Sequence, residues 1–162
     1  MAPAVSSLNM ANRPGRLLFL CTGNYYRSRF AEMWFNHLAA AAGVAWQADS
    51  RGLYTKLNYL LPGVISPETV FALAARGVTM PNPHRAPLEC SARDLVAFDR
   101  VIAVKESEHR PLMRSRFPSF SGRLDYWTIH DVDQTSAEVA IAELDAHVRR
   151  LIDELSVEHR PA

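Results

Sequence analysis

The chain has 162 residues, of which 48% are hydrophobic and 22% are charged, a composition ordinary for one globular domain with its own core. Its 18 basic and 17 acidic residues are interspersed and give a formal net charge of +1, which argues against a nucleic-acid or polybasic membrane surface. Two cysteines, with no signal-peptide core and no apolar run of membrane length, predict a cytoplasmic protein without a membrane anchor. We expect residues 1–15 to be a disordered leader and residues 16–157 to form a single domain.

The first predicted elements are a strand and a helix joined by a short loop. Residues 17–20 are apolar without alternation, which predicts a strand that is buried on both faces and ends at Cys21. From Ser28 the apolar residues recur every three or four positions, which predicts a helix that ends at a Gly43 cap. Backbone N–H groups in such a loop converge at the positive end of the helix and favour an anion.

Cys21 opens this loop and Arg27 closes it. A thiol beside a guanidinium at a helix N-terminus is a candidate thiolate nucleophile, and the guanidinium offers a planar fork that matches two phosphate oxygens. Gly23 and Asn24 readily adopt the left-handed backbone of a tight loop. Taken singly, such a cysteine is usually a small buried hydrophobe, and such an arginine is usually solvated. Together, as Cys-x5-Arg-Ser between a strand and a helix, they favour an anion-binding nucleophile.

The segment from Cys21 to Ser28 resembles the phosphate-binding loop of the low-molecular-weight protein tyrosine phosphatases, whose pattern is Cys-x-Gly-Asn-x-Cys-Arg-Ser. Tyr26 departs from it, since the family usually has a second cysteine there. The resemblance runs from Arg16 to about Leu155, although its specificity lies mainly in this loop. It implies phosphate binding by Thr22, Gly23, Asn24, Tyr25, Tyr26, Arg27 and Ser28.

Residues 44–48 predict a second strand, and residues 49–52 a turn that resembles the family's Asp-Ser-Ala-Gly segment. Residues 53–65 show no clear period and predict a loop. Ser66-Pro67-Glu68 predicts a helix start, and that helix should end at Gly77.

A proline-fixed loop at residues 80–86 carries His84. The resemblance implies that Asn24, Ser28, Ser50 and His84 form a hydrogen-bond network that holds the phosphate loop in shape. The sequence alone is equally compatible with a solvent-exposed His84.

The remaining elements complete an alternation of strands and helices. A capping box at residues 91–94 opens a short helix, residues 99–104 predict a third strand, and a polar helix from Lys105 cannot extend past Pro118. Residues 123–129 predict a fourth strand, and one long helix follows. This order predicts an α/β fold of three layers, a four-stranded parallel sheet flanked by helices, with the Cys21 loop at the carboxyl edge of the sheet.

Cleavage of an ester by a thiolate needs an acid to protonate the leaving oxygen. Asp131 is the first candidate, because the resemblance places an Asp-Pro step after an aromatic-rich strand. Val132 replaces the proline, which leaves Asp133 as a second candidate. Either aspartate could instead cap the last helix, although Thr135 and Ser136 are also available as caps.

The predicted reaction is hydrolysis of a phosphotyrosine protein or a small aryl phosphate through a cysteinyl phosphate, without cofactor or metal, by a monomer or weak dimer. An arsenate reductase of the same fold is an alternative. It would need a relay of cysteines, and Cys90 is the only other thiol, with Lys105 near the expected relay position. An inactive phosphopeptide-binding module is a second alternative, motivated by the bulk of Tyr26.

Overall fold

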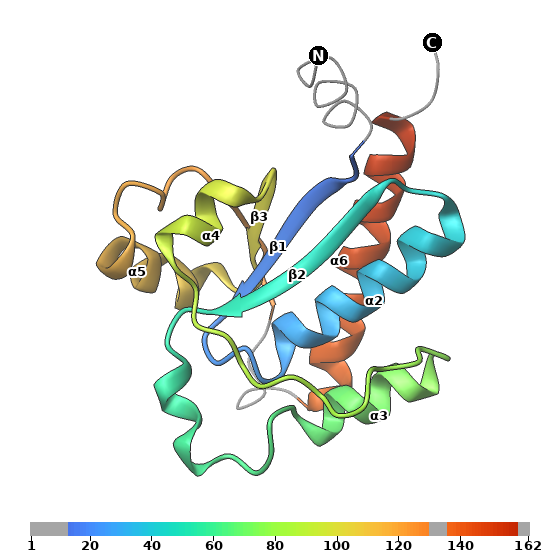
Figure 1. Cartoon of the computed structure of the whole chain (residues 1–162), viewed down its shortest axis with the longest axis horizontal. Helices are drawn as coiled ribbons and strands as arrows, with labels where there is room; N and C mark the ends of the chain where they lie inside the picture. The colour runs from blue at the N-terminus through green and yellow to red at the C-terminus, as the bar shows by residue number, and fades with distance from the viewer. Residues whose placement is uncertain (1–12, 130–135, 159–162) are drawn as a thin grey trace, which may run out of the picture.

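A computed structural model describes residues 13–129 and 136–158 of the chain (Figure 1). Its four strands form one sheet in the order β2-β1-β3-β4, and every neighbouring pair is parallel. The strands are β1 (Gly15–Cys21), β2 (Trp46–Gly52), β3 (Arg100–Ala103) and β4 (Asp125–Tyr126). The helices are α2 (Arg27–Ala42), η1 (Thr55–Leu60, a 3-10 helix), α3 (Pro67–Ala75), α4 (Ala92–Ala97), α5 (Glu106–Arg116) and α6 (Ala137–Glu158). The predicted fold class is confirmed.

The side chains of β1 divide the core into two layers because successive residues of a strand point to opposite faces. Leu17 and Phe19 pack into the larger cluster, which α2, α3 and α6 complete. Leu18 and Leu20 pack into the smaller cluster under α4 and α5. Figure 1 shows these two groups of helices on opposite sides of the sheet. All four residues are fully buried, which accounts for the apolar run without alternation in the sequence.

The strand order places the Cys21 loop at the point where the chain changes direction across the sheet. From β1 the chain crosses by α2 to β2 on one side, and β3 then pairs with β1 on the other side. In open parallel sheets, ligands bind at such a switch point, beyond the carboxyl ends of the strands. The loop that follows Cys21 lies there.

Several helix boundaries follow the predicted caps. Gly43 ends α2 in a left-handed conformation with φ 68°, and the Ser91–Asp94 capping box at the start of α4 is formed. α5 ends at Arg116, two residues before Pro118.

The prediction was wrong in three places. Residues 49–52 are the second half of β2 rather than a turn, because they pair in register with residues 18–21 of β1. The stretch expected as a loop at residues 53–65 contains η1. The fourth strand is reduced to Asp125 and Tyr126, at the edge of the sheet.

The first twelve residues of the expected leader lie outside the described residues, while Arg13 pairs with Asp99 and Gly15 begins β1.

Candidate active site

Every carbonyl group of residues 21–26 accepts a hydrogen bond from a neighbouring segment. The carbonyls of Cys21 and Thr22 accept from the backbone N–H groups of Leu53 and Tyr54, at 2.9 and 2.8 Å. The other four donors are Asn58 Nδ2 to Gly23, Arg29 Nη1 to Asn24, Ser66 N to Tyr25 and Thr69 Oγ1 to Tyr26. Because the N–H and C=O groups of a trans peptide point in opposite directions, the N–H groups that follow these carbonyls are directed away from the neighbouring segments.

The N-terminus of α2 continues this set of donors. Tyr26 is its N-cap residue and makes no side-chain capping bond, and the first turn of α2 contains no acidic residue. The positive end of the helix is therefore available to an anion from outside.

Cys21 lies at the base of the loop and is only 2% exposed. Its sulfur is 2.9 Å from the hydroxyl of Ser28, and the backbone N–H of Asn24 donates to it at 3.2 Å. Ser28 Oγ already accepts a bond of 2.9 Å from Asn24 Nδ2, so its own proton is free to point at the sulfur. Two donors thus converge on the predicted nucleophile and can stabilise negative charge there.

Asn24 holds the loop by using all four hydrogen-bonding positions of its side-chain amide. Nδ2 donates to Ser28 and Ser50 at 2.9 Å each, and Oδ1 accepts from Arg85 Nη1 at 2.9 Å and from the Leu88 N–H at 3.0 Å. The backbone of Asn24 has φ 51°, the left-handed region expected for this position. A buried amide that is fully satisfied fixes the loop in one conformation.

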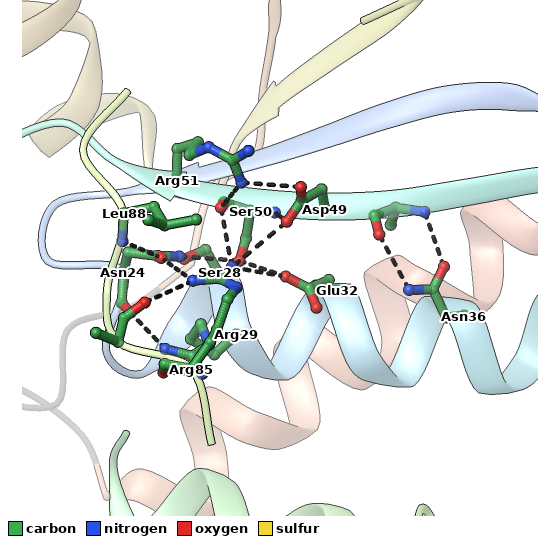
Figure 2. A network of polar contacts seen from close by, with 12 residues as sticks. Asn24, Ser28, Arg29, Glu32, Asn36, Asp49, Ser50, Arg51, Arg85 and Leu88 are labelled. Carbon is green, nitrogen blue, oxygen red and sulfur yellow. Dashed lines mark hydrogen bonds and ion pairs between the residues drawn. The ribbon is translucent and has the colours of Figure 1, made fainter. Parts of the chain in front are cut away.

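The network continues behind the loop along α2 and β2 (Figure 2). Ser50 Oγ donates to Glu32 Oε1 at 2.6 Å, and Arg85 Nη2 contacts Ser50 Oγ at 3.0 Å and Glu32 Oε1 at 3.1 Å. Burial raises the pKa of Glu32, while the Ser50 hydrogen bond and the charge of Arg85 act in the opposite direction.

Arg85, rather than its neighbour His84, occupies the place that the resemblance gave to a histidine. Within the described residues, His84 makes no hydrogen bond with Asn24, Ser28 or Ser50, and its Nδ1 is buried without a partner. Arg85 was not among the predicted site residues, although it lies in the proline-fixed loop at residues 80–86.

A carboxylate that the sequence analysis also missed contacts Arg27. Glu108 Oε2 lies 2.7 Å from Arg27 Nη2 and 3.0 Å from His109 Nε2, and it accepts a short hydrogen bond from the Thr22 hydroxyl. Burial alone would raise the pKa of Glu108. The interactions with His109 and with the charge of Arg27 outweigh burial and hold that pKa well below its usual range.

His109 is fully buried on α5, and its Nδ1 accepts a hydrogen bond from the Lys105 N–H at 3.0 Å. The ring proton therefore lies on Nε2, which faces Glu108. Burial lowers the pKa of His109 and so favours the neutral ring.

Cys21, Arg27 and Glu108 line one cavity of about 310 Å³. The other lining residues are Thr22, Gly23, Tyr25, Tyr26, Leu57, Asn58 and Leu61. The Tyr26 hydroxyl donates to the Ala137 carbonyl at 3.2 Å, and its ring packs against the larger core cluster. The bulk of Tyr26 is therefore directed toward α6 rather than across the cavity.

Asp131 and Asp133 lie outside the described residues. Trp127, four residues before Asp131, donates its backbone N–H to Ala103 at the end of β3. In the described part of the chain no three His, Cys, Asp or Glu side chains are grouped as metal ligands, and no helix is long and apolar enough to cross a membrane.

This arrangement defines a class of protein, an α/β enzyme with a cysteine at the base of an anion-binding loop between a strand and a helix. The sequence profile described as low molecular weight phosphotyrosine protein phosphatase matches residues 16–159 of the chain. The chain belongs to this family of phosphatases.

Solved structures agree with this assignment. The low molecular weight protein tyrosine phosphatase from T. tengcongensis superimposes with a TM-score of 0.68 at 28% identity, over 89% of this chain and 99% of that chain. A low molecular weight protein tyrosine phosphatase from Bacillus subtilis gives a TM-score of 0.71 at 21% identity, over 90% and 99%. A mutant of YwlE from Bacillus subtilis also gives 0.71 at 21% identity, over 87% and 98%. At this identity, both Bacillus subtilis structures show likeness of fold alone. No curated protein sequence matches the chain.

Proposed function

We propose that this phosphatase hydrolyses phosphotyrosine-type phosphomonoesters through a cysteinyl phosphate on Cys21. The observation that carries the proposal is the set of donors around Cys21 Sγ, with the Ser28 hydroxyl at 2.9 Å and the Asn24 N–H at 3.2 Å. Arg27 lines the same cavity. A sulfur held in this way can carry negative charge both as nucleophile and as leaving group.

In the first step, Cys21 Sγ attacks phosphorus and the bond to the ester oxygen breaks. The loop N–H groups and Arg27 bind the three remaining phosphoryl oxygens, where charge accumulates in the transition state. Asp131 protonates the departing oxygen. In the second step, water deprotonated by Asp131 attacks phosphorus, the S–P bond breaks, and Ser28 donates to the sulfur as it leaves.

The reaction is tested by hydrolysis of p-nitrophenyl phosphate and of a phosphotyrosine peptide by the purified protein. We expect the wild type and Cys90→Ser to turn over both substrates, while Cys21→Ser has no measurable turnover and still binds phosphate. Retention of turnover in Cys21→Ser would exclude Cys21 as the nucleophile. If the wild type, Cys90→Ser and Cys21→Ser all lack turnover and still bind phosphate, the phosphopeptide-binding module is favoured.

The choice between Asp131 and Asp133 is tested by the dependence of the rate on the leaving group. Asp131→Asn should slow aryl phosphates with basic leaving oxygens far more than those with acidic ones, because only a basic oxygen needs the proton. If Asp133→Asn shows this dependence on the leaving group and Asp131→Asn does not, Asp133 is the general acid.

The arsenate reductase alternative has little support, because burial raises the pKa of Cys90 to about 12 and makes this thiol a poor relay partner. The binding module loses its motivation, since the Tyr26 hydroxyl is bonded to α6. We further propose that the protein acts in the cytoplasm as a monomer or weak dimer.

A further inference from the structure

Arg29, in the first turn of α2, is fully buried and directed behind the phosphate loop (Figure 2). Its Nη1 donates to the carbonyls of Asn24 and Val64, at 3.3 Å each, and its Nη2 donates to the Arg85 carbonyl at 2.9 Å. All three acceptors are neutral. Among residues 13–129 and 136–158, no carboxylate forms an ion pair with Arg29, and its Nε has no hydrogen-bond partner.

The two carboxylates whose charges act on Arg29, those of Glu32 and Asp49, form ion pairs with other arginines. Glu32 Oε1 and Asp49 Oδ1 contact Arg85 Nη2 at 3.1 and 3.4 Å, and Asp49 also contacts Arg51 at 2.9 Å. The charges of Glu32 and Asp49 therefore favour the charged form of Arg29, although neither carboxylate forms an ion pair with it.

Burial of a cation at this position costs free energy. A buried charge without a paired counter-ion is strongly destabilising, and the first turn of a helix is already positive. The cost is offset if an anion lies close by, and the loop whose Asn24 carbonyl Arg29 binds also holds Cys21 Sγ through the Asn24 N–H. A phosphoryl group bound in that loop would bring two further negative charges.

Arg29 remains charged at neutral pH. Burial and the charge of Arg85 lower its pKa to about 10, while the charges of Glu32, Cys21 and Asp49 act to raise it.

We propose that Arg29 is a positioning residue of the phosphate site, which supplies a second positive charge from behind the loop and holds the Asn24 carbonyl away from the pocket. It touches neither the sulfur nor the substrate. The proposal rests on the proposed function and adds to it a residue that governs phosphate affinity and the reactivity of Cys21.

The test compares Arg29→Gln, which keeps hydrogen-bond donors and loses the charge, with Arg29→Lys, which keeps the charge. Arg76→Gln is the control, because Arg76 has its own carboxylate partner, Asp145, at 2.9 Å on another part of the fold. The readouts are the rate at which iodoacetamide alkylates Cys21 as a function of pH, and the phosphate concentration that halves this rate. Neither readout requires turnover.

Other ionisable groups around Cys21 and Arg29 are unchanged in these variants. They are Arg27, Tyr25 and Tyr26 of the loop, Glu108 of α5, Glu32 of α2, Asp49 of β2 and Arg85. Differences between the pH profiles of the variants therefore report the charge at position 29.

We expect Arg29→Gln to need on the order of tenfold more phosphate for protection and to shift the alkylation profile to higher pH, by about one pH unit. Arg29→Lys and Arg76→Gln should stay within about threefold of the wild type. An Arg29→Gln protein that melts at lower temperature, with unchanged protection and pH profile, would reduce Arg29 to a structural role. A folded Arg29→Lys with the full tenfold loss would also overturn the proposal, and this holds even if Arg29→Gln fails to fold.

The outcome is separable from that of the proposed function. If the wild type hydrolyses no phosphomonoester and the Arg29 variants still change phosphate protection as expected, the role of Arg29 stands and the enzyme assignment fails. If turnover is observed and protection is independent of residue 29, the assignment stands and the Arg29 proposal fails.

Discussion

Arg27 is held on the pocket wall by the carboxylate of Glu108, 2.7 Å from its Nη2. A guanidinium in this position can present two parallel N–H groups to a phosphoryl group, which an ammonium cannot do. We therefore expect Arg27→Lys to lower kcat for p-nitrophenyl phosphate by about 100-fold or more, although the charge is conserved. Arg110→Lys, on α5 and outside the lining of the cavity, is the matched control and should not change kcat. A near wild-type rate in Arg27→Lys would make Arg27 a surface charge.

Glu108 accepts hydrogen bonds from Thr22 and Arg27, and its Oε2 lies 3.0 Å from His109 Nε2. Because its charge is neutralised by Arg27 and by the Thr22 hydrogen bond, its repulsion of a phosphate dianion is weakened, and its effect on the orientation of Arg27 should dominate. We expect Glu108→Gln to lower the free energy of unfolding by about 1–3 kcal/mol and kcat by about tenfold.

The control for Glu108 lies two residues away on the same helix. Glu106→Gln removes an exposed carboxylate that pairs with Arg110, and it should change stability by less than about 0.5 kcal/mol and leave kcat unchanged. Equal effects of the two substitutions in urea unfolding and in turnover would show that Glu108 has no special role.

At the scale of elements, η1 fits against the phosphate loop through a close approach at Gly23. Asn58 Nδ2 donates to the Gly23 carbonyl at 2.6 Å, and a Cβ at position 23 would lie 2.3 Å from Asn58 Oδ1. We expect Gly23→Ala to displace Asn58 and to lower the free energy of unfolding by about 1–3 kcal/mol. Gly122→Ala, where a Cβ meets no atom within 4 Å, should be neutral.

Asn58→Ala provides the second arm of this test. If the clash with Asn58 is the cause, Gly23→Ala should cost little stability in the Asn58→Ala background, as a double-mutant cycle of denaturant unfolding would show. An equal loss in both backgrounds would place the strain in the backbone of the loop itself.

The elements that local chemistry specifies could be predicted from the sequence. The Gly43 cap, the Ser91–Asp94 capping box and the apolar run of β1 each carry their signal within a few residues. The second half of β2 could not be predicted, because Asp49–Gly52 consists of turn-forming residues that are extended through pairing with β1.

The residues of the candidate site also divide into those that could be predicted from the sequence and those that could not. Cys21, Asn24, Arg27 and Ser28 lie in one loop and could be identified together. Arg85 and Glu108 reach this loop from segments more than fifty residues away. Charged side chains are common in loops and on polar helices, so neither residue carries a local signal of its role.

At the scale of the whole molecule, the sheet keeps the two cysteines apart. Cys21 pairs with Gly52, and Gly52 forms a bridge to Glu89, next to Cys90. Two strand spacings separate the two cysteines by about 10 Å, beyond the 7 Å or so that a disulfide allows between Cα atoms.

Cys90 is also unreactive. Burial raises the pKa of Cys90 to about 12, so the thiol is protonated at pH 8, and only the thiolate is reactive. Since Tyr26 provides no thiol in the loop, peroxide should inactivate the protein with poor recovery on addition of dithiothreitol, and phosphate should slow the loss. Full recovery, with a Cys21–Cys90 disulfide detected by mass spectrometry, would contradict this arrangement.

The central claim is that Cys21 carries the phosphoryl group during turnover. The direct measurement is to quench the protein in acid while it hydrolyses p-nitrophenyl phosphate, digest it, and locate the phosphorylated residue by mass spectrometry. We predict phosphate on the sulfur of Cys21, with more of it in Asp131→Asn if that residue also activates the water, and none in Cys21→Ser. Turnover with phosphate trapped on another residue, or with phosphate released by Cys21→Ser at the wild-type rate, would contradict the claim.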